Sequence, residues 1–274
     1  MIAATYIINL AQCTERWRSM HPLLADMRAP DPIRFEAVDG AALAAADLTA
    51  LQNDGRLATD MTAFDRDCMA GEIGCALSHA AVLAEIVERR LPAAMVLEDD
   101  IALDGRAETW AARFDRAFGD LPPTWELWYL YRCFDIEHRI RRISSRTVVP
   151  WTPQGGAAYA VTLAGARKLL AALTPVSSAV DRVYAQMVQA REIEAYAASP
   201  LLIRPGVHPS VINRDNPAKG WMVNGVNSPP EYWPEDYLDH LGETPPPRPA
   251  ALRLGRGILS AAAAGVRRLA MRFS

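Results

Sequence analysis

The chain has 274 residues, of which half are apolar and 22% are charged. A chain of this length and composition can bury a large core, which excludes extensive disorder and favours one α/β domain, alone or with an appendage. The net charge is −3, but residues 250–274 hold five arginines and no acid, which leaves 24 basic and 32 acidic residues before them. The acidic body excludes nucleic acid as a partner, because contacts to phosphates need a positive surface.

Cysteine usage and the N-terminal residues indicate a cytoplasmic protein. The four cysteines form no CxxC pair and no disulfide framework, so we expect reduced thiols. Zinc binding by Cys68, Cys75 and His79 is the alternative, although this spacing matches no common zinc module. Residues 1–10 lack the basic start of a signal peptide, and no apolar run approaches the ~20 residues that cross a bilayer.

Strands alternate with helices along the N-terminal half. Apolar, β-branched runs predict the strands, and apolar residues at intervals of three and four predict the helices. Residues 41–67 are predicted as helical and loop material without defined bounds. In chain order, the other elements are a strand at 3–10, a helix at 14–27 that Pro22 interrupts, a strand at 33–38, a helix at 71–90 and a strand at 93–103.

The same alternation continues in the C-terminal half. The predicted elements are a helix at 107–118, a strand at 126–131, a loop and short strand within 148–161, and helices at 163–173 and 178–191. Alternating strands and helices predict an α/β fold with a mainly parallel, Rossmann-type sheet flanked by helices. We expect this domain at 1–212, a loop and Pro-rich linker at 213–249, and a further helix at 250–274.

Three consecutive acids, Glu98, Asp99 and Asp100, come at the end of the apolar strand predicted around 93–103. Packed together they repel one another, and burying one unpaired charge costs several kcal/mol. Mn²⁺ or Mg²⁺ removes the difficulty, because such ions prefer carboxylates together with phosphate oxygens. Alternation along a strand directs Glu98 and Asp100 to one face, so we expect Asp100 and one neighbour to bind the ion. The alternative is a solvated acidic turn or an arginine-paired cluster.

The acidic triplet belongs to a longer series of motifs. The chain carries YIINL at 6–10, AVDG at 37–40, GEIGCALSH at 71–79 and VLEDDI at 96–101, in this order. The series resembles glycosyltransferase family 25, which includes lipooligosaccharide-building enzymes of Gram-negative bacteria and relatives of collagen galactosyltransferases. The likeness spans residues 6–212. It implies a GT-A-like fold, Mn²⁺ or Mg²⁺ on the donor diphosphate, UDP-galactose or UDP-glucose as donor, and an inverting reaction.

The resemblance also implies roles for the acidic residues. Asp100, with Asp99 or Glu98, would bind the metal ion that neutralises the leaving diphosphate. Asp181 is the candidate for the base or for an acceptor-binding carboxylate, and the alternative for Asp181 is a helix cap. Residues 177–180 separate Asp181 from a Pro-Val pair that it more often follows directly in relatives.

Further residues are predicted to bind the donor. Asn9 and Arg16 would reach the nucleotide, and a surface position on a helix is the alternative for Arg16. Asp39 would hold the ribose or uracil, or would simply form an Asp-Gly turn. Gly156 would let a loop approach the sugar, or would only make a turn. Ser78 and His79 belong to the matched GEIGCALSH block, and a satisfied core histidine is the alternative for His79.

Residues 250–274 form a basic amphipathic pattern. At 100° per residue the arginines occupy one side, and the apolar residues Ile258, Leu259, Val266, Leu269 and Phe273 occupy the other. This pattern predicts a helix on a membrane surface, and docking on the protein's own body is the alternative.

The sequence thus predicts a metal-dependent glycosyltransferase. We expect it to move galactose or glucose from a UDP-sugar to a lipopolysaccharide-type, glycolipid or other saccharide acceptor, peripherally on the inner face of the cytoplasmic membrane. One alternative is a metal-dependent nucleotidyltransferase that uses the same acidic strand end. The other is a catalytically inactive nucleotide-sugar-binding module.

Overall fold

A computed structural model describes residues 1–64, 69–133, 135 and 139–206. The predicted linker at 213–249, the predicted helix at 250–274 and Cys68 lie outside the described residues. So do the domain boundaries that we expected at 212 and 249.

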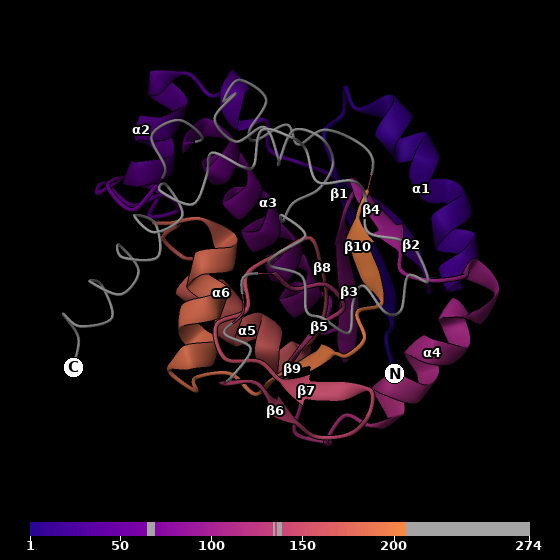
Figure 1. Cartoon of the computed structure of the whole chain (residues 1–274). Helices are drawn as coiled ribbons and strands as arrows, with labels where there is room; N and C mark the ends of the chain where they lie inside the picture. The colour runs from indigo at the N-terminus through magenta and orange to yellow at the C-terminus, as the bar shows by residue number, and fades with distance from the viewer. Residues whose placement is uncertain (65–68, 134, 136–138, 207–274) are drawn as a thin grey trace, which may run out of the picture. The chain divides into compact units, whose positions relative to one another are not determined.

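An eight-stranded sheet with the order β2-β1-β3-β8-β5-β9-β7-β6 forms the centre of the described fold (Figure 1). Six strands run in one direction, and β7 and β8 run the opposite way. A second sheet pairs β4 with β10 in antiparallel fashion. The strands are β1 Ala4–Asn9, β2 Pro32–Glu36, β3 Ala93–Glu98, β4 Ile101–Leu103, β5 Leu127–Tyr129, β6 Arg141–Arg142, β7 Thr147–Val149, β8 Ala158–Thr162, β9 Ala195–Ala198 and β10 Ile203–Pro205.

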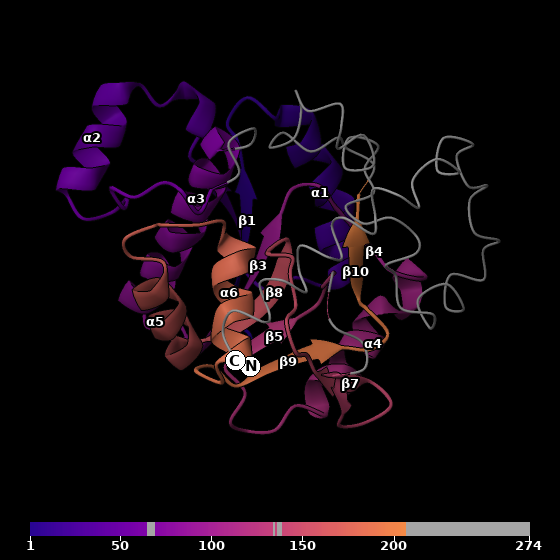
Figure 2. The same cartoon turned by 60° about the vertical axis from the view of Figure 1, so that its left-hand side comes forward.

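Helices cover both faces of the large sheet. Side chains of α3, α5 and α6 pack in one apolar cluster, and those of α1 and α4 pack in another, on the opposite face (Figures 1 and 2). Along β1 the side chains alternate between the clusters, with Tyr6 and Ile8 in the first and Ile7 in the second. The helices are α1 Thr14–Met27, the 3₁₀ turn η1 Gly40–Ala42, α2 Ala45–Asn53, α3 Met69–Glu88, α4 Ala107–Gly119, α5 Leu163–Ala172 and α6 Val180–Gln189.

The predicted α/β class and the mainly parallel, helix-flanked sheet are confirmed. The prediction that Pro22 interrupts the first helix is wrong, because α1 continues through it. Arg18, whose carbonyl loses its helical partner at Pro22, and Pro22 itself are both exposed, so water can satisfy that carbonyl. The predicted strand at 93–103 is two strands, β3 and β4, and the chain turns between them at Asp99 and Asp100.

Helix α3 is the one described helix that is long and apolar enough to span a membrane by length and composition. Half of its most apolar window is buried inside the fold, and it packs against α5 and against both β1 and β3. We therefore interpret α3 as a core helix of the α/β domain.

The strand directions bring several loops to one edge of the sheet. Strands β1, β2 and β3 are mutually parallel, so their carboxyl ends meet there. Strand β8 is antiparallel to β3 and pairs Ala158 with Leu97, so β8 begins at this same edge. Ligands of open α/β sheets bind beyond the carboxyl ends of the strands. This edge is therefore the place to look for a functional site.

Candidate active site

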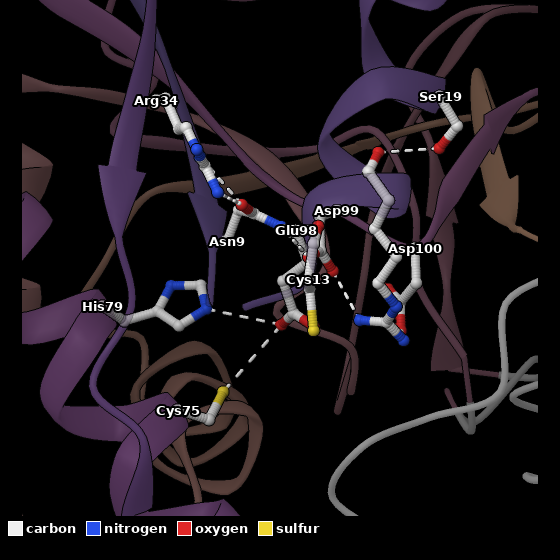
Figure 3. A network of polar contacts seen from close by, with 10 residues as sticks. Asn9, Cys13, Ser19, Arg34, Cys75, His79, Glu98, Asp99 and Asp100 are labelled. Atoms are coloured by element: carbon white, nitrogen blue, oxygen red, sulfur yellow. Dashed lines mark hydrogen bonds and ion pairs between the residues drawn. The ribbon is translucent and has the colours of Figure 1, made fainter. Parts of the chain in front are cut away.

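Asp99 is buried beyond the end of β3, and both of its carboxylate oxygens accept hydrogen bonds. Asn9 Nδ2 donates to Oδ2 at 2.5 Å, and Arg16 Nη1 donates to Oδ1 at 2.5 Å (Figure 3). Arg34 fixes Asn9 in turn, because its Nε and Nη2 donate to Asn9 Oδ1 at 2.9 and 2.6 Å. Burial raises the pKa of Asp99, and the charge of Arg16 and the Asn9 hydrogen bond counteract the rise. The arginine-paired alternative therefore describes Asp99.

These contacts bear on three expectations. Both oxygens of Asp99 already accept hydrogen bonds from protein donors, so Asp99 has less free capacity for a metal ion than Asp100 has. Arg16 is buried, not a surface residue of α1. The polar atoms of Asn9 and Arg16 contact the carboxylates of Asp99 and Asp100 beyond the end of β3.

Asp100 differs from Asp99, because one of its oxygens is left open. Its Oδ2 lies 3.4 Å from Arg16 Nη2, whereas its buried Oδ1 has no hydrogen-bond partner among the residues that the structure describes. Burial raises the pKa of Asp100 to about 7, and the negative charge of Glu98 adds to the rise. A buried carboxylate oxygen without a donor is costly, and a bound cation would satisfy it. Asp100 thus fits the predicted metal ligand.

Glu98 points toward α3 on the other side of the strand end (Figure 3). Its Oε1 lies 3.4 Å from His79 Nε2 and 3.9 Å from Cys75 Sγ. His79 is fully buried, and its Nδ1 lies 3.0 Å from Tyr159 Oη, which lies 3.1 Å from Tyr184 Oη. His79 is therefore a hydrogen-bonded core histidine, which was the alternative prediction for this residue. It also contacts the acidic triplet directly, through Glu98.

Two different sets of ligands meet at Glu98. Cys75 and His79 are four residues apart on α3 and so share one face, and their ligand atoms lie within 4.8 Å of one another and of Glu98. Thiolate, imidazole and carboxylate suit Zn²⁺, whereas the oxygens of Glu98 and Asp100 suit Mn²⁺ or Mg²⁺. Burial, followed by the charge of Glu98, raises the pKa of Cys75, so its thiol is protonated in the metal-free protein. By donor chemistry alone, Glu98 with Asp100 suits the predicted ion better than the group of Cys75, His79 and Glu98 does.

Asp181 approaches this cluster from the first turn of α6. Ala179, not Asp181, is the N-cap residue, and Asp181 Oδ1 accepts a hydrogen bond from the backbone N–H of Arg182 at 2.8 Å. Burial raises the pKa of Asp181 most, and the charge of Glu98 raises it further. Asp181 is also among the charges that raise the pKa of Cys75. The structure therefore brings the candidate base close to the acidic strand end.

Gly156 lies where the loop before β8 passes His79. A Cβ at Gly156 would sit 3.7 Å from His79 Cε1 and Nε2 and 3.1 Å from Val180 Cγ1. The next residue, Ala157, accepts a hydrogen bond from the backbone N–H of Glu98 at 2.8 Å. Gly156 thus borders the site, and the small size of glycine has a steric reason here.

Asp39 and Ser78 have structural roles at the neighbouring loop. Asp39 Oδ1 accepts from the backbone N–H of Ala41 at 3.1 Å, which caps η1, and Oδ2 accepts from Gln12 Nε2 at 2.7 Å. The buried hydroxyl of Ser78 accepts from the backbone N–H of Val38 at 2.8 Å and donates to a carbonyl of its own helix. The turn alternative for Asp39 is thus realised, and Ser78 joins α3 to that turn.

Gly74 is a close contact of this junction and yields a stability prediction. A Cβ at Gly74 would lie 2.6 Å from the backbone atoms Gly40 N and Val38 O, which cannot move aside as a flexible side chain can. We expect Gly74→Ala to lower the free energy of unfolding by about 1–3 kcal/mol, although alanine favours a helix. Urea denaturation measures this. Gly119→Ala is the control, because a Cβ there meets no atom within 4 Å, and an equal loss in both variants would contradict the prediction.

Sequence reasoning missed several residues of this cluster. Arg34 reaches Asn9 across the β1–β2 pair, and only the register of the sheet reveals that proximity. Tyr184 extends the His79–Tyr159 chain from α6 without any motif of its own. Cys75 was considered as a zinc ligand together with Cys68 and His79, but the third member of the group described here is Glu98, which comes from a strand.

Comparisons with known proteins agree with this geometry. The model of glycosyltransferase family 25 (LPS biosynthesis protein) matches residues 2–132, which include Glu98 and Asp100. Human procollagen galactosyltransferase 2 is 27% identical over 220 residues, covering 73% of this chain and 34% of the relative. Human inactive glycosyltransferase 25 family member 3 is 29% identical over 222 residues, covering 73% of this chain and 36% of the relative.

Among solved structures, apo mouse xyloside xylosyltransferase 1 aligns with a TM-score of 0.34 and 8% identity, over 82% of this chain and 80% of that one. This similarity is too weak to carry an argument. The chain spans about a third of the length of the curated relatives it matches. Because those relatives include a galactosyltransferase and a member described as inactive, sequence similarity alone assigns no activity.

An α/β sheet with polar side chains beyond the carboxyl ends of its parallel strands belongs to the class of open α/β folds that bind ligands at that edge. Within that class, the chain is similar to glycosyltransferase family 25, whose model matches residues 2–132.

Proposed function

We propose that this protein transfers galactose or glucose from a UDP-sugar to a saccharide acceptor in a metal-dependent, inverting reaction. The single observation that carries the proposal is the buried, unpartnered oxygen of Asp100 beside Glu98 at the carboxyl edge of the sheet. Such a pair suits Mn²⁺ or Mg²⁺, which bind to one or two carboxylates and to substrate phosphates.

Asp100 and Glu98 would hold the ion, whose charge neutralises the diphosphate as it leaves the sugar. Asn9 and Arg16 act through Asp99: they fix its carboxylate and thereby fix the neighbouring Asp100. Arg16 also places a guanidinium beside Asp100 Oδ2, which limits the repulsion between the carboxylates. The protein thus prepares the site before donor and ion arrive.

Asp181 is the proposed base that takes the proton of the acceptor hydroxyl. Burial and Glu98 raise its pKa, which makes the carboxylate a stronger base than an exposed aspartate. An inverting reaction needs such a base on the face of the sugar opposite the leaving group.

The acceptor and the place of action extend this proposal. A glycolipid acceptor of the lipopolysaccharide type would accord with the basic amphipathic residues 250–274, which would bind an anionic membrane surface on its cytoplasmic side.

Turnover with UDP-galactose and UDP-glucose tests the proposal. In the presence of Mn²⁺ and a panel of saccharide acceptors, we expect one donor to release free UDP, and we expect EDTA to abolish the release. Release of hexose 1-phosphate in its place would show a nucleotidyltransferase, because transfer of the UMP group leaves the sugar phosphate behind. Metal-dependent donor binding without release of UDP with any acceptor would show an inactive binding module. Either result would contradict the proposal.

A further inference from the structure

A second candidate site lies at the opposite end of α6 from Asp181. It is a cavity of about 430 Å³ beside strands β6, β7 and β9, which lie next to one another in the sheet (Figure 1). We call it the arginine pocket. Its polar and aromatic lining consists of Arg139, Arg141, Arg191, Trp151, Tyr196 and Glu194.

The charge of the arginine pocket is strongly unbalanced. Three arginines and a single acidic residue, Glu194, line the pocket, although the chain before residue 250 carries an excess of acids. None of the three arginines has an ion pair with a described residue. Guanidinium groups that converge on one cavity without a carboxylate partner favour binding of a phosphate or carboxylate, with which they form charge-assisted hydrogen bonds.

Contacts within the protein hold part of the lining of the arginine pocket in place. The Arg139 guanidinium lies 5.3 Å from the centre of the Trp151 ring, a cation–π distance. Trp151 is held in turn by Asp135, whose carboxylate accepts hydrogen bonds from the backbone N–H of Trp151 at 3.1 Å and from the backbone N–H of Thr152 at 2.7 Å. The Asp135 side chain is completely buried and lies 3.3 Å from Arg132 Nη1. A buried network therefore fixes the aromatic wall.

The position of the pocket relates it to the active site. Helix α6 has Asp181 in its first turn, and Val188, in its last turn, lines the arginine pocket. Ten helical residues span about 15 Å, a distance that an oligosaccharide bridges and a single sugar does not. The loop that begins at Trp151 also leads directly to Gly156 beside His79.

We propose that the arginine pocket binds an anionic sugar, one that carries a phosphate or a carboxylate, by pairing its charge with the arginines and its ring with the aromatic wall. The further assignment of this sugar to the acceptor rests on the proposed glycosyl transfer. The binding itself does not rest on glycosyl transfer, so the binding proposal and the proposed function can fail separately.

NMR titration of the whole protein with ¹⁵N-labelled tryptophan tests the binding. The indole signal of Trp151 is assigned by its absence in Trp151→Phe, and the probes are glucose 6-phosphate, glucuronic acid, inorganic phosphate and glucose. We expect the Trp151 signal to shift with glucose 6-phosphate or glucuronic acid, and to shift less with inorganic phosphate or glucose at equal concentration. Comparison of the two anionic sugars decides between phosphate and carboxylate.

Arg141→Gln and Arg191→Gln should each weaken the binding roughly tenfold, because each removes a charge-assisted hydrogen bond. Arg142→Gln is the matched control, because Arg142 is the exposed neighbour of Arg141 on β6 and does not line the pocket. The control should bind as the unchanged protein does. The absence of a shift with both anionic sugars, equal shifts with glucose or with inorganic phosphate, or equal affinities in all three variants would overturn the proposal.

Discussion

Asp100→Asn is expected to reduce glycosyl transfer by roughly 100-fold or more, because it removes a charged ligand of the ion that stabilises the leaving diphosphate. The same substitution is expected to stabilise the metal-free protein at pH 8. The amide keeps the shape of the side chain but removes a negative charge that is buried next to Glu98 and Asp99. A gain of stability together with a loss of function is typical of functional sites.

The sign of the pH dependence follows from the raised pKa of Asp100. The pKa is about 7 in the folded protein and about 3.9 in an unfolded chain, so between these values the folded state holds a proton that the unfolded state has lost. In the metal-free protein this contribution to stability is therefore largest below pH 4 and falls as the pH rises from about 4 to about 7. Asp100→Asn should lack this fall.

Thermal unfolding between pH 4 and pH 8, with EDTA or with Mn²⁺, measures both effects. Mn²⁺ should raise the melting temperature of the unchanged protein at pH 8 but not that of Asp100→Asn. Asp26→Asn is the control, because Asp26 is exposed on α1. If Asp100→Asn melted at a lower temperature than the unchanged protein in EDTA at pH 8, this would contradict the claim that the buried charge of Asp100 destabilises the metal-free protein.

Arg16→Gln is expected to lower the free energy of unfolding by about 3–5 kcal/mol. Arg16 supplies the positive charge next to the buried Asp99 carboxylate. Without Arg16, the negative charge of Asp99 keeps only the neutral Asn9 amide as a side-chain donor among the contacts described here. The pKa of Asp99 should rise further in the variant, so its deficit should shrink as the pH falls and the carboxyl group takes up a proton.

Urea denaturation at pH 7 and pH 4.5 measures the loss and its pH dependence. Arg18→Gln, an exposed position on the same helix, is the matched control and should change stability by less than about 0.5 kcal/mol. The double variant Arg16→Gln/Asp99→Asn should recover much of the loss, because no unpaired charge remains. A loss in Arg16→Gln that is no larger than that of Arg18→Gln would contradict the role of this pair.

The sequence predicted the strand end that carries the three acids. It did not predict which carboxylate is engaged by protein donors and which keeps an unpartnered oxygen. A buried apolar run followed by Glu98, Asp99 and Asp100 is visible locally, and so are the helices with clear apolar spacing, such as α3. The engagement of Asp99 by Asn9 and Arg16 depends on contacts over 90 and 83 residues, which no local pattern encodes. The short strands β9 and β10 were missed, because pairing with neighbouring strands defines them more than their composition does.

The arginine pocket could not be predicted from local sequence patterns either. Its arginines lie up to 52 residues apart in sequence, from Arg139 to Arg191, and belong to different elements. Each looks like an ordinary surface residue until the strand order brings β6, β7 and β9 next to one another.

The central claim is that Asp100 and Glu98 hold a divalent ion on the donor diphosphate. The most direct measurement is the melting temperature with UDP, with and without Mn²⁺, for the unchanged protein and for Asp100→Asn. At saturating concentrations UDP and Mn²⁺ together should raise the melting temperature of the unchanged protein by roughly 5 °C or more, neither alone should match this, and the variant should show no such rise. An equal rise with UDP in EDTA, or an equal rise in the variant, would contradict the claim.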